Sequence, residues 1–169
     1  MRRGQAMIET VLAVLFITFV FFGLFQLSQM LTARILLDHA AARAARAKAV
    51  GFNAFMCRKA ARVATIPIAG RRLWPDDLEG ASEVSRVPIY LSTRNEQIAR
   101  GVLQYERWET LGLDVRSSHG LVPEAEADVS IELPRFWSWG WKRDDSPISM
   151  SGSAALESHF PLYMDDGGL

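Results

Sequence analysis

Length, composition and charge exclude several classes of protein. The chain has 169 residues, which suits one domain of ordinary size once a membrane segment has been set aside. Nineteen basic residues balance nineteen acidic ones, so the overall charge gives no reason to expect nucleic acid or another polyanion as a partner. Cys57 is the single cysteine, which excludes an intramolecular disulfide and a thiolate metal cluster.

The balanced charge hides a gradient along the chain. Between Arg34 and Arg72 there are nine Lys or Arg residues and one acid, Asp38. Acidic residues gather later, from Glu124 to Asp128 and again near the C-terminus. The chain therefore has a basic stretch after its first apolar segment and a more acidic remainder.

The first apolar segment is long enough to cross a bilayer. Residues 11–25 carry no charge, and the apolar character continues to Leu31. A bilayer core needs about 20 helical residues, which residues 8–31 supply. A secretory signal peptide is the alternative, because Met-Arg-Arg before an apolar run is its usual opening. The apolar run is longer than the usual signal core, and no clear small-x-small cleavage site follows it.

Helical character continues beyond this segment. The stretch from 33 to 50 is dense in Ala, Leu, Arg and Lys, which are strong helix formers. We therefore expect one helix over residues 5–50, with Gly51 as its first stop signal. Ala40, Ala44 and Ala47 share a face of small residues, which allows close packing. Either the chain's own domain or another subunit could pack against that face.

Glu9 stands directly before the uncharged run. An ionisable group at the edge of the hydrocarbon costs a few kcal/mol unless it is paired, so it is a functional hypothesis by default. The alternative is a carboxylate that stays solvated among the lipid headgroups.

The residues around Glu9 carry a family resemblance. Arg2-Arg3-Gly4-Gln5-Ala6-Met7-Ile8-Glu9 places a glycine after a short basic leader and a glutamate five residues later. Together with the apolar helix and the AAARAARAKAVG stretch, this resembles the TadE/TadG-like pseudopilins of Flp (Tad) pilus systems, and by length it resembles TadE. The resemblance covers about the first 50 residues.

The resemblance implies processing and assembly in the membrane. A prepilin peptidase would cut after Gly4, so that Gln5 becomes the new N-terminus and residues 1–4 form the leader. Glu9 would then neutralise the free amino group of a neighbouring subunit. The resemblance also implies a single-pass protein of the bacterial inner membrane, with a cytoplasmic N-terminus and a periplasmic or extracellular domain. A count of positive charges beside the span favours the opposite orientation.

Residues 51–169 are expected to form the exported domain, a small α+β unit with an antiparallel sheet. Pro, Asp and Gly indicate a loop at 71–80, and Pro88 favours an edge strand over a central one. A capping box at Thr93 to Glu96 favours a helix after it. The expected helices are 52–64 and 94–111, and the expected strands are 84–91, 128–134 and 147–158.

Three tryptophans lie between the last two strands, which are expected to pair as an antiparallel hairpin. Trp137, Trp139 and Trp141 alternate with Ser and Gly at its tip. Tryptophan combines apolar area with a polar N–H, so the tip suits a partner surface or a membrane interface. The alternative is that the rings fold back and complete a small core.

The sequence offers no recognisable catalytic or cofactor motif. It has no phosphate-binding glycine loop, no nucleophile elbow and no zinc-ligand spacing. The three histidines are scattered, so we expect no metal site, no cofactor and no enzyme activity.

The function that these features favour is a minor pilin-like subunit that primes, caps or anchors a bacterial Flp/Tad-type pilus or secretion filament. Its partners would be other pilin-like subunits, the prepilin peptidase and the pilus platform. The alternative is an unprocessed single-pass envelope protein whose exported domain binds a partner or ligand.

Overall fold

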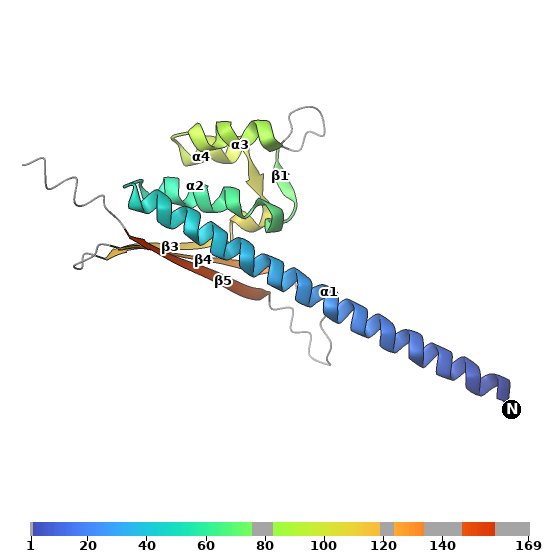
Figure 1. The fold of residues 1–169 in the computed structure, drawn as a ribbon. Coiled ribbons are helices and arrows are strands. Elements are labelled where there is room, and N and C mark those ends of the chain that lie inside the picture. The colour runs from blue at the N-terminus through green and yellow to red at the C-terminus, as the bar shows by residue number, and fades with distance from the viewer. Residues whose placement is uncertain (1, 76–82, 119–123, 134–146, 158–169) are drawn as a thin grey trace, which may run out of the picture. The chain divides into compact units, whose positions relative to one another are not determined.

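The computed structural model describes residues 2–75, 83–118, 124–133 and 147–157. They fall into two compact units, Met1–Ala33 and Arg34–Leu169. A long apolar helix is followed by a domain that combines helices with antiparallel sheets (Figure 1). The expected α+β fold class is confirmed.

The first helix, α1, spans Arg2–Ala49 and contains nearly all of the helix expected from the sequence. Within α1, the stretch Gln5–Ala49 is long and apolar enough to cross a membrane. No other helix among the described residues meets that condition. Gly51 ends it as expected. Its φ of 89° is left-handed, a conformation that glycine adopts without a steric penalty. The Gly51 amide donates to Lys48 O and the Phe52 amide to Ala47 O, which satisfies two terminal carbonyls.

The main sheet has three antiparallel strands in the order β3-β4-β5: β3 is Gly112–Ser118, β4 is Glu124–Leu133 and β5 is Ile148–Glu157. The register pairs Val129 of β4 with Leu113 of β3 and with Gly152 of β5. The expected pairing of the last two strands is confirmed, and the tip between them lies outside the described residues. The strand β3 was not predicted from the sequence, because its apolar alternation consists only of Leu113 and Val115.

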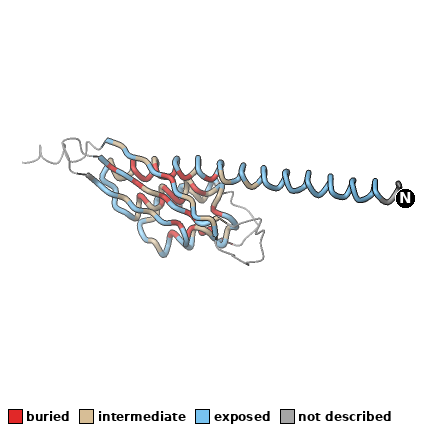
Figure 2. The backbone as a smooth tube through the Cα atoms, turned by 90° about the horizontal axis from the view of Figure 1, so that it is seen from below, coloured by how far each residue is buried: buried red, intermediate tan, exposed pale blue. Residues whose placement is uncertain are grey.

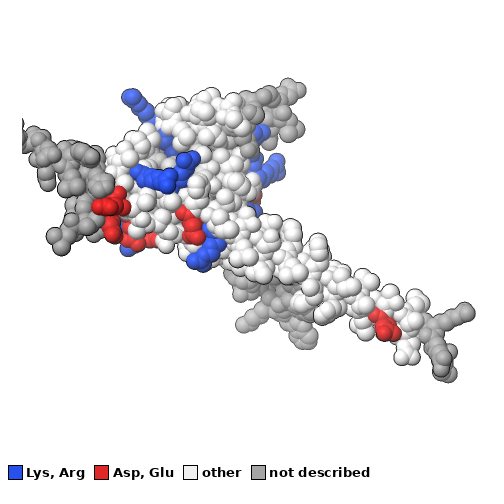
Figure 3. All heavy atoms as spheres, in the orientation of Figure 1, with Lys and Arg blue, Asp and Glu red and all other residues white. Residues whose placement is uncertain are grey.

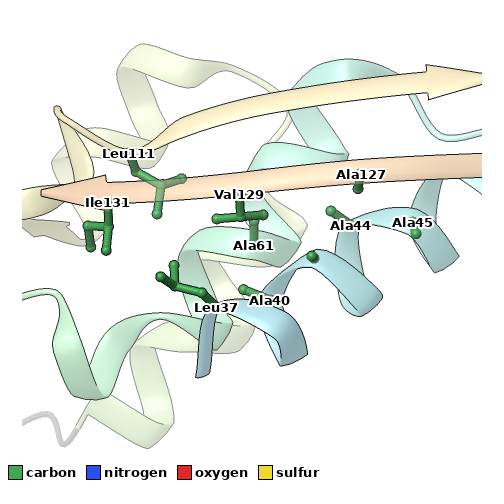
Figure 4. Close-up of a cluster of buried hydrophobic side chains, with 10 residues drawn as sticks. Leu37, Ala40, Ala44, Ala45, Ala61, Leu111, Ala127, Val129 and Ile131 are labelled. Carbon is green, nitrogen blue, oxygen red and sulfur yellow. The ribbon is translucent and has the colours of Figure 1, made fainter. Parts of the chain in front are cut away.

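The main core lies between this sheet and two helices, the last part of α1 and α2 (Ala54–Ala64). Figure 4 shows the alanines of α1 directed at the side chains of β4. Figure 2 shows buried positions on both the helices and the strands of the domain. The alanine face of α1 thus packs on the chain's own domain, which is one of the two alternatives. Ala47, expected on that face, is only partly buried. The fully buried members of this core are Leu37, Ala40, Ala41, Ala44, Ala45, Ala61, Ala127, Val129 and Ile131.

Gly152 sets how closely α1 approaches the sheet. A Cβ at this position of β5 would lie 2.5 Å from the Asp38 backbone nitrogen and 2.5 Å from the Leu37 carbonyl carbon. Both atoms belong to the helix backbone, which cannot move aside as a flexible side chain could. Alanines on the helix and a glycine on the strand therefore allow backbone-to-backbone packing.

A second core lies on the other side of α2. It is enclosed by α3 (Glu83–Ser92), α4 (Glu96–Val102) and the short pair β1 (Arg72–Trp74) and β2 (Gln104–Tyr105), with short 3-10 helices at Ile66–Ile68 and Glu106–Trp108. Tyr90, Tyr105 and Trp108 form its centre, and the Trp108 ring centroid lies 5.4 Å from that of Tyr90 and 4.8 Å from that of Tyr105.

Two predictions for this part of the chain are wrong. The expected edge strand at 84–91 is the helix α3, because a helical turn brings Val87 and Tyr90 together on the aromatic core. Pro88 is exposed on this helix. The predicted loop at 71–80 contains the strand β1.

The expected helix over 94–111 is also wrong in its extent. It begins after Asn95, whose Oδ1 accepts from the Gln97 amide at 2.8 Å, and it ends at Val102. Leu103 is extended and buried, and the chain then continues into β2 so that Trp108 can enter the aromatic core. The expected helix at 52–64 is confirmed as α2, although its buried side includes Cys57, Lys59 and Arg62 beside alanine.

Gly152 provides a test of the close packing. We expect Gly152→Val to lower the free energy of unfolding by about 2 kcal/mol or more, because the added methyl groups must displace helix backbone. The measurement is denaturant unfolding of the full chain in detergent, followed by circular dichroism. Gly101→Ala is the control, because its Cβ meets nothing within 4 Å in α4, and it should be neutral or stabilising by up to about 1 kcal/mol. Equal stability of Gly152→Val and the parent would contradict the packing described.

Candidate functional site

The expected processing and assembly residues lie at the start of α1. Gly4 and Gln5 are in its first turn, and Glu9 lies one turn further along. Gln5 and Glu9 are exposed. Glu9 is the one ionisable residue between Gln5 and Ala33, and it has no ion-pair partner among the side chains that the structure describes.

The apolar surface of this segment is uncovered. Every described residue from 5 to 25 is exposed, including five phenylalanines whose exposed fractions range from 42% to 67%. An apolar surface of this extent needs lipid or other helices around it. The threonine hydroxyls of α1 are hydrogen-bonded within the helix and so do not need water. Thr18 donates to Val14 O at 2.8 Å, and Thr32 donates to Ser28 O at 2.9 Å.

The comparison with protein families decides what this segment is. The family model described as TadE-like protein matches residues 4–46. Residues 4–46 are similar to TadE-like proteins. The match covers about a quarter of the chain and includes Gly4, Glu9 and the alanines that reach the core. The resemblance seen in the sequence is confirmed. No curated protein and no solved structure matches the chain significantly.

The match is to a family of Tad pilus systems, and α1 is long and apolar enough to cross a membrane. TadE-like proteins are structural components of the pilus and are not known as an enzyme family. Among the described residues, no group of three or more His, Cys, Asp or Glu side chains could hold a metal ion. Trp137, Trp139 and Trp141 lie outside the described residues, so their role at the hairpin tip stays a prediction.

The domain contains a polar cluster that the sequence analysis did not identify. Glu96, the first residue of α4, receives three guanidinium groups at one carboxylate oxygen. Glu96 Oε1 lies 3.8 Å from Arg58 Nη1, 3.9 Å from Arg62 Nη1 and 3.3 Å from Arg100 Nη2. We call Arg58, Arg62 and Arg100 the arginine cluster. Arg100 follows Glu96 by one helical turn, a spacing visible in the sequence, but the two arginines of α2 reach Glu96 only through the fold.

Arg62 forms the buried base of this cluster. Its side chain is only 6% exposed, whereas those of Arg58 and Arg100 are 41% and 52% exposed. Arg62 Nη2 donates to Trp108 O at 3.5 Å, but Nε has no hydrogen-bond partner among the described atoms. Burial raises the pKa of the Tyr90 hydroxyl, and the neighbouring Arg62 guanidinium opposes that rise. Three cations therefore share one carboxylate, and the cluster carries excess positive charge.

Lys59 is a charged residue that lies buried beside the second core, where carbonyl oxygens accept hydrogen bonds from its ammonium group. Its side chain is buried, and Nζ donates to the carbonyl oxygens of Leu91 at 2.7 Å and Thr93 at 2.5 Å. These are terminal carbonyls at the end of α3, where a cation also opposes the helix dipole favourably. Nζ further lies 4.7 Å from the centroid of the Phe55 ring. Burial lowers the pKa of Lys59, so its place in the structure depends on these acceptors.

The single cysteine offers a test of the burial of α2. Burial raises the pKa of the Cys57 thiol, and the side chain has no exposed surface. Because the thiolate is the reactive form, we expect the folded chain to resist maleimide at neutral pH. Mass spectrometry should find at least about tenfold faster labelling in denaturant. Equally fast labelling of the folded chain would show that α2 is not packed as described.

Proposed function

We propose that this protein is a minor pilin-like subunit that primes, caps or anchors a bacterial Flp/Tad-type pilus or secretion filament. The observation that supports this function most directly is the TadE-like match over residues 4–46, which contains Gly4, Glu9 and the exposed apolar helix together. The function is assembly through helix packing, and no catalysis is proposed.

The proposed processing removes residues 1–4. A prepilin peptidase would cleave on the cytoplasmic side after Gly4 and leave Gln5 with a free amino group. The helix then anchors the subunit in the inner membrane with its N-terminus in the cytoplasm, and the domain that follows is exported. Processing would place the new positive charge four residues before Glu9, at the same end of α1.

Glu9 would register one subunit against the next. A carboxylate and an ammonium group are each costly in hydrocarbon, and pairing them removes most of the penalty of leaving either alone. In this proposal the two charges come from different subunits, and the exposed Glu9 and its exposed apolar surroundings are accessible to a neighbouring helix. Pairing between helices would bury both the charges and the apolar surface.

The processing step can be measured directly. When the full chain is co-expressed with a prepilin peptidase, we expect its mass to fall by residues 1–4 and its N-terminus to be Gln5. Gly4→Leu should keep its full mass, because the peptidase would no longer accept the side chain before the scissile bond. The proposal fails if the parent keeps Met1 to Gly4 in the presence of a peptidase that cleaves a known prepilin.

Glu9 can be tested separately from processing. We expect Glu9→Gln to be cleaved normally but to enter sheared filament fractions at least about tenfold less than the parent, because the amide cannot neutralise the neighbouring amino group. Thr18→Ala is the matched control, since it removes only a hydrogen bond within the same helix. Quantitative mass spectrometry of the fractions gives the comparison. Parent-like incorporation of Glu9→Gln would contradict the registration role.

A further inference from the structure

The outer face of the main sheet is acidic. On β4, residues at alternate positions face away from the core, and Glu124, Glu126 and Glu132 among them are exposed. Strand register places further carboxylates of β3 and β5 on the same side. We call this surface the acidic sheet face. It comprises Asp114, Glu124, Glu126, Asp128, Glu132 and Glu157, with Arg116 as its single basic residue among the described side chains.

The acidic sheet face is poorly compensated within the domain. The register sets Asp114 directly opposite Asp128, and Glu124 directly opposite Glu157. Like charges directly opposite each other destabilise a sheet. Arg116 forms an ion pair with Asp114 and interacts electrostatically with Asp128 and Glu126, so this single cation is shared by three of the six carboxylates. A cationic surface from outside would relieve this repulsion.

The arginine cluster carries an excess of positive charge, opposite in sign to that of the acidic sheet face. Its three guanidinium groups share the single carboxylate of Glu96. Arg62 Nε is buried with no described hydrogen-bond partner, and the Arg62 guanidinium lies beside the Tyr90 hydroxyl. Arginine is the residue best suited to bind carboxylates. Arg58 and Arg100 are exposed enough to meet such a group.

One molecule cannot bring the two surfaces together. The inner face of the sheet packs on α1 and α2, so the acidic sheet face points away from the helices. The arginine cluster lies on α2 and α4, on the helical side of the domain. In Figure 3 most of the visible basic atoms lie over the helices, whereas acidic atoms lie at the strand end of the domain and also on α1. Two copies can satisfy both surfaces.

We propose that the acidic sheet face of one copy binds the arginine cluster of a second copy. Because the two surfaces differ, the contact is heterologous and leaves one surface of each kind free at either end. Such a contact repeats from copy to copy along a row. The contact involves only the domain, and it forms whether or not residues 1–4 are removed.

Cysteine cross-linking of the full chain in liposomes tests this contact without a peptidase, so its result is separate from that of the processing experiment. One tagged copy carries Arg100→Cys and a differently tagged copy carries Glu126→Cys. A short bismaleimide should join the two variants at least about fivefold more efficiently than it joins either variant to itself. Raising the salt to about 0.5 M should reduce the yield, because exposed charges are screened.

Two controls keep the test decisive. The parent reports any cross-linking through Cys57, which is buried, and Arg94→Cys provides an exposed site outside the cluster. Arg58→Cys replaces Arg100→Cys if that variant does not fold by circular dichroism. The proposal is overturned if the Arg100→Cys and Glu126→Cys pair gives no more product than Arg94→Cys with Glu126→Cys, or if its yield does not respond to salt.

Discussion

The close packing of α1 on β5 is the contact on which the rest of the domain depends. Alanines on the helix and Gly152 on the strand let two backbones approach without side chains between them. The helix thereby covers one side of a three-stranded sheet that would otherwise expose its apolar face. α2 covers the neighbouring part of that face and carries the second core on its other side. One continuous helix thus provides first an exposed apolar surface and then part of a domain core.

The TadE-like match ends within the alanine-rich part of α1. The matched residues 4–46 include both the apolar segment and the alanines that pack on the sheet. The remaining domain supplies the surface that an assembled subunit would show to its neighbours. In this protein that surface has two sides of opposite charge, the arginine cluster and the acidic sheet face.

The elements that the sequence predicted are those whose local signals agree with their tertiary contacts. α1 has uninterrupted helix formers and Gly51 as a stop, and β4 has strict alternation of apolar and polar residues. The processing residues were visible because their order along the chain carries the signal. The region from 83 to 111 was mispredicted because Pro88 suggested a strand edge, whereas the aromatic core around Trp108 determines the local structure there. The arginine cluster was not predictable, since its members meet only when α2 and α4 pack together.

The last part of α1 belongs to the domain core, and we propose that its first part is a membrane anchor. Hydrogen–deuterium exchange of the full chain in lipid nanodiscs tests this most directly, since it reports protection segment by segment. We expect the backbone amides of residues 37–45 to exchange as slowly as those of β4. Denaturant that unfolds the sheet should speed up exchange in both segments together, while the amides of residues 11–25 stay protected by lipid. Fast exchange at 37–45 beside a protected β4 would show that the helix does not form part of the core, and would contradict the account.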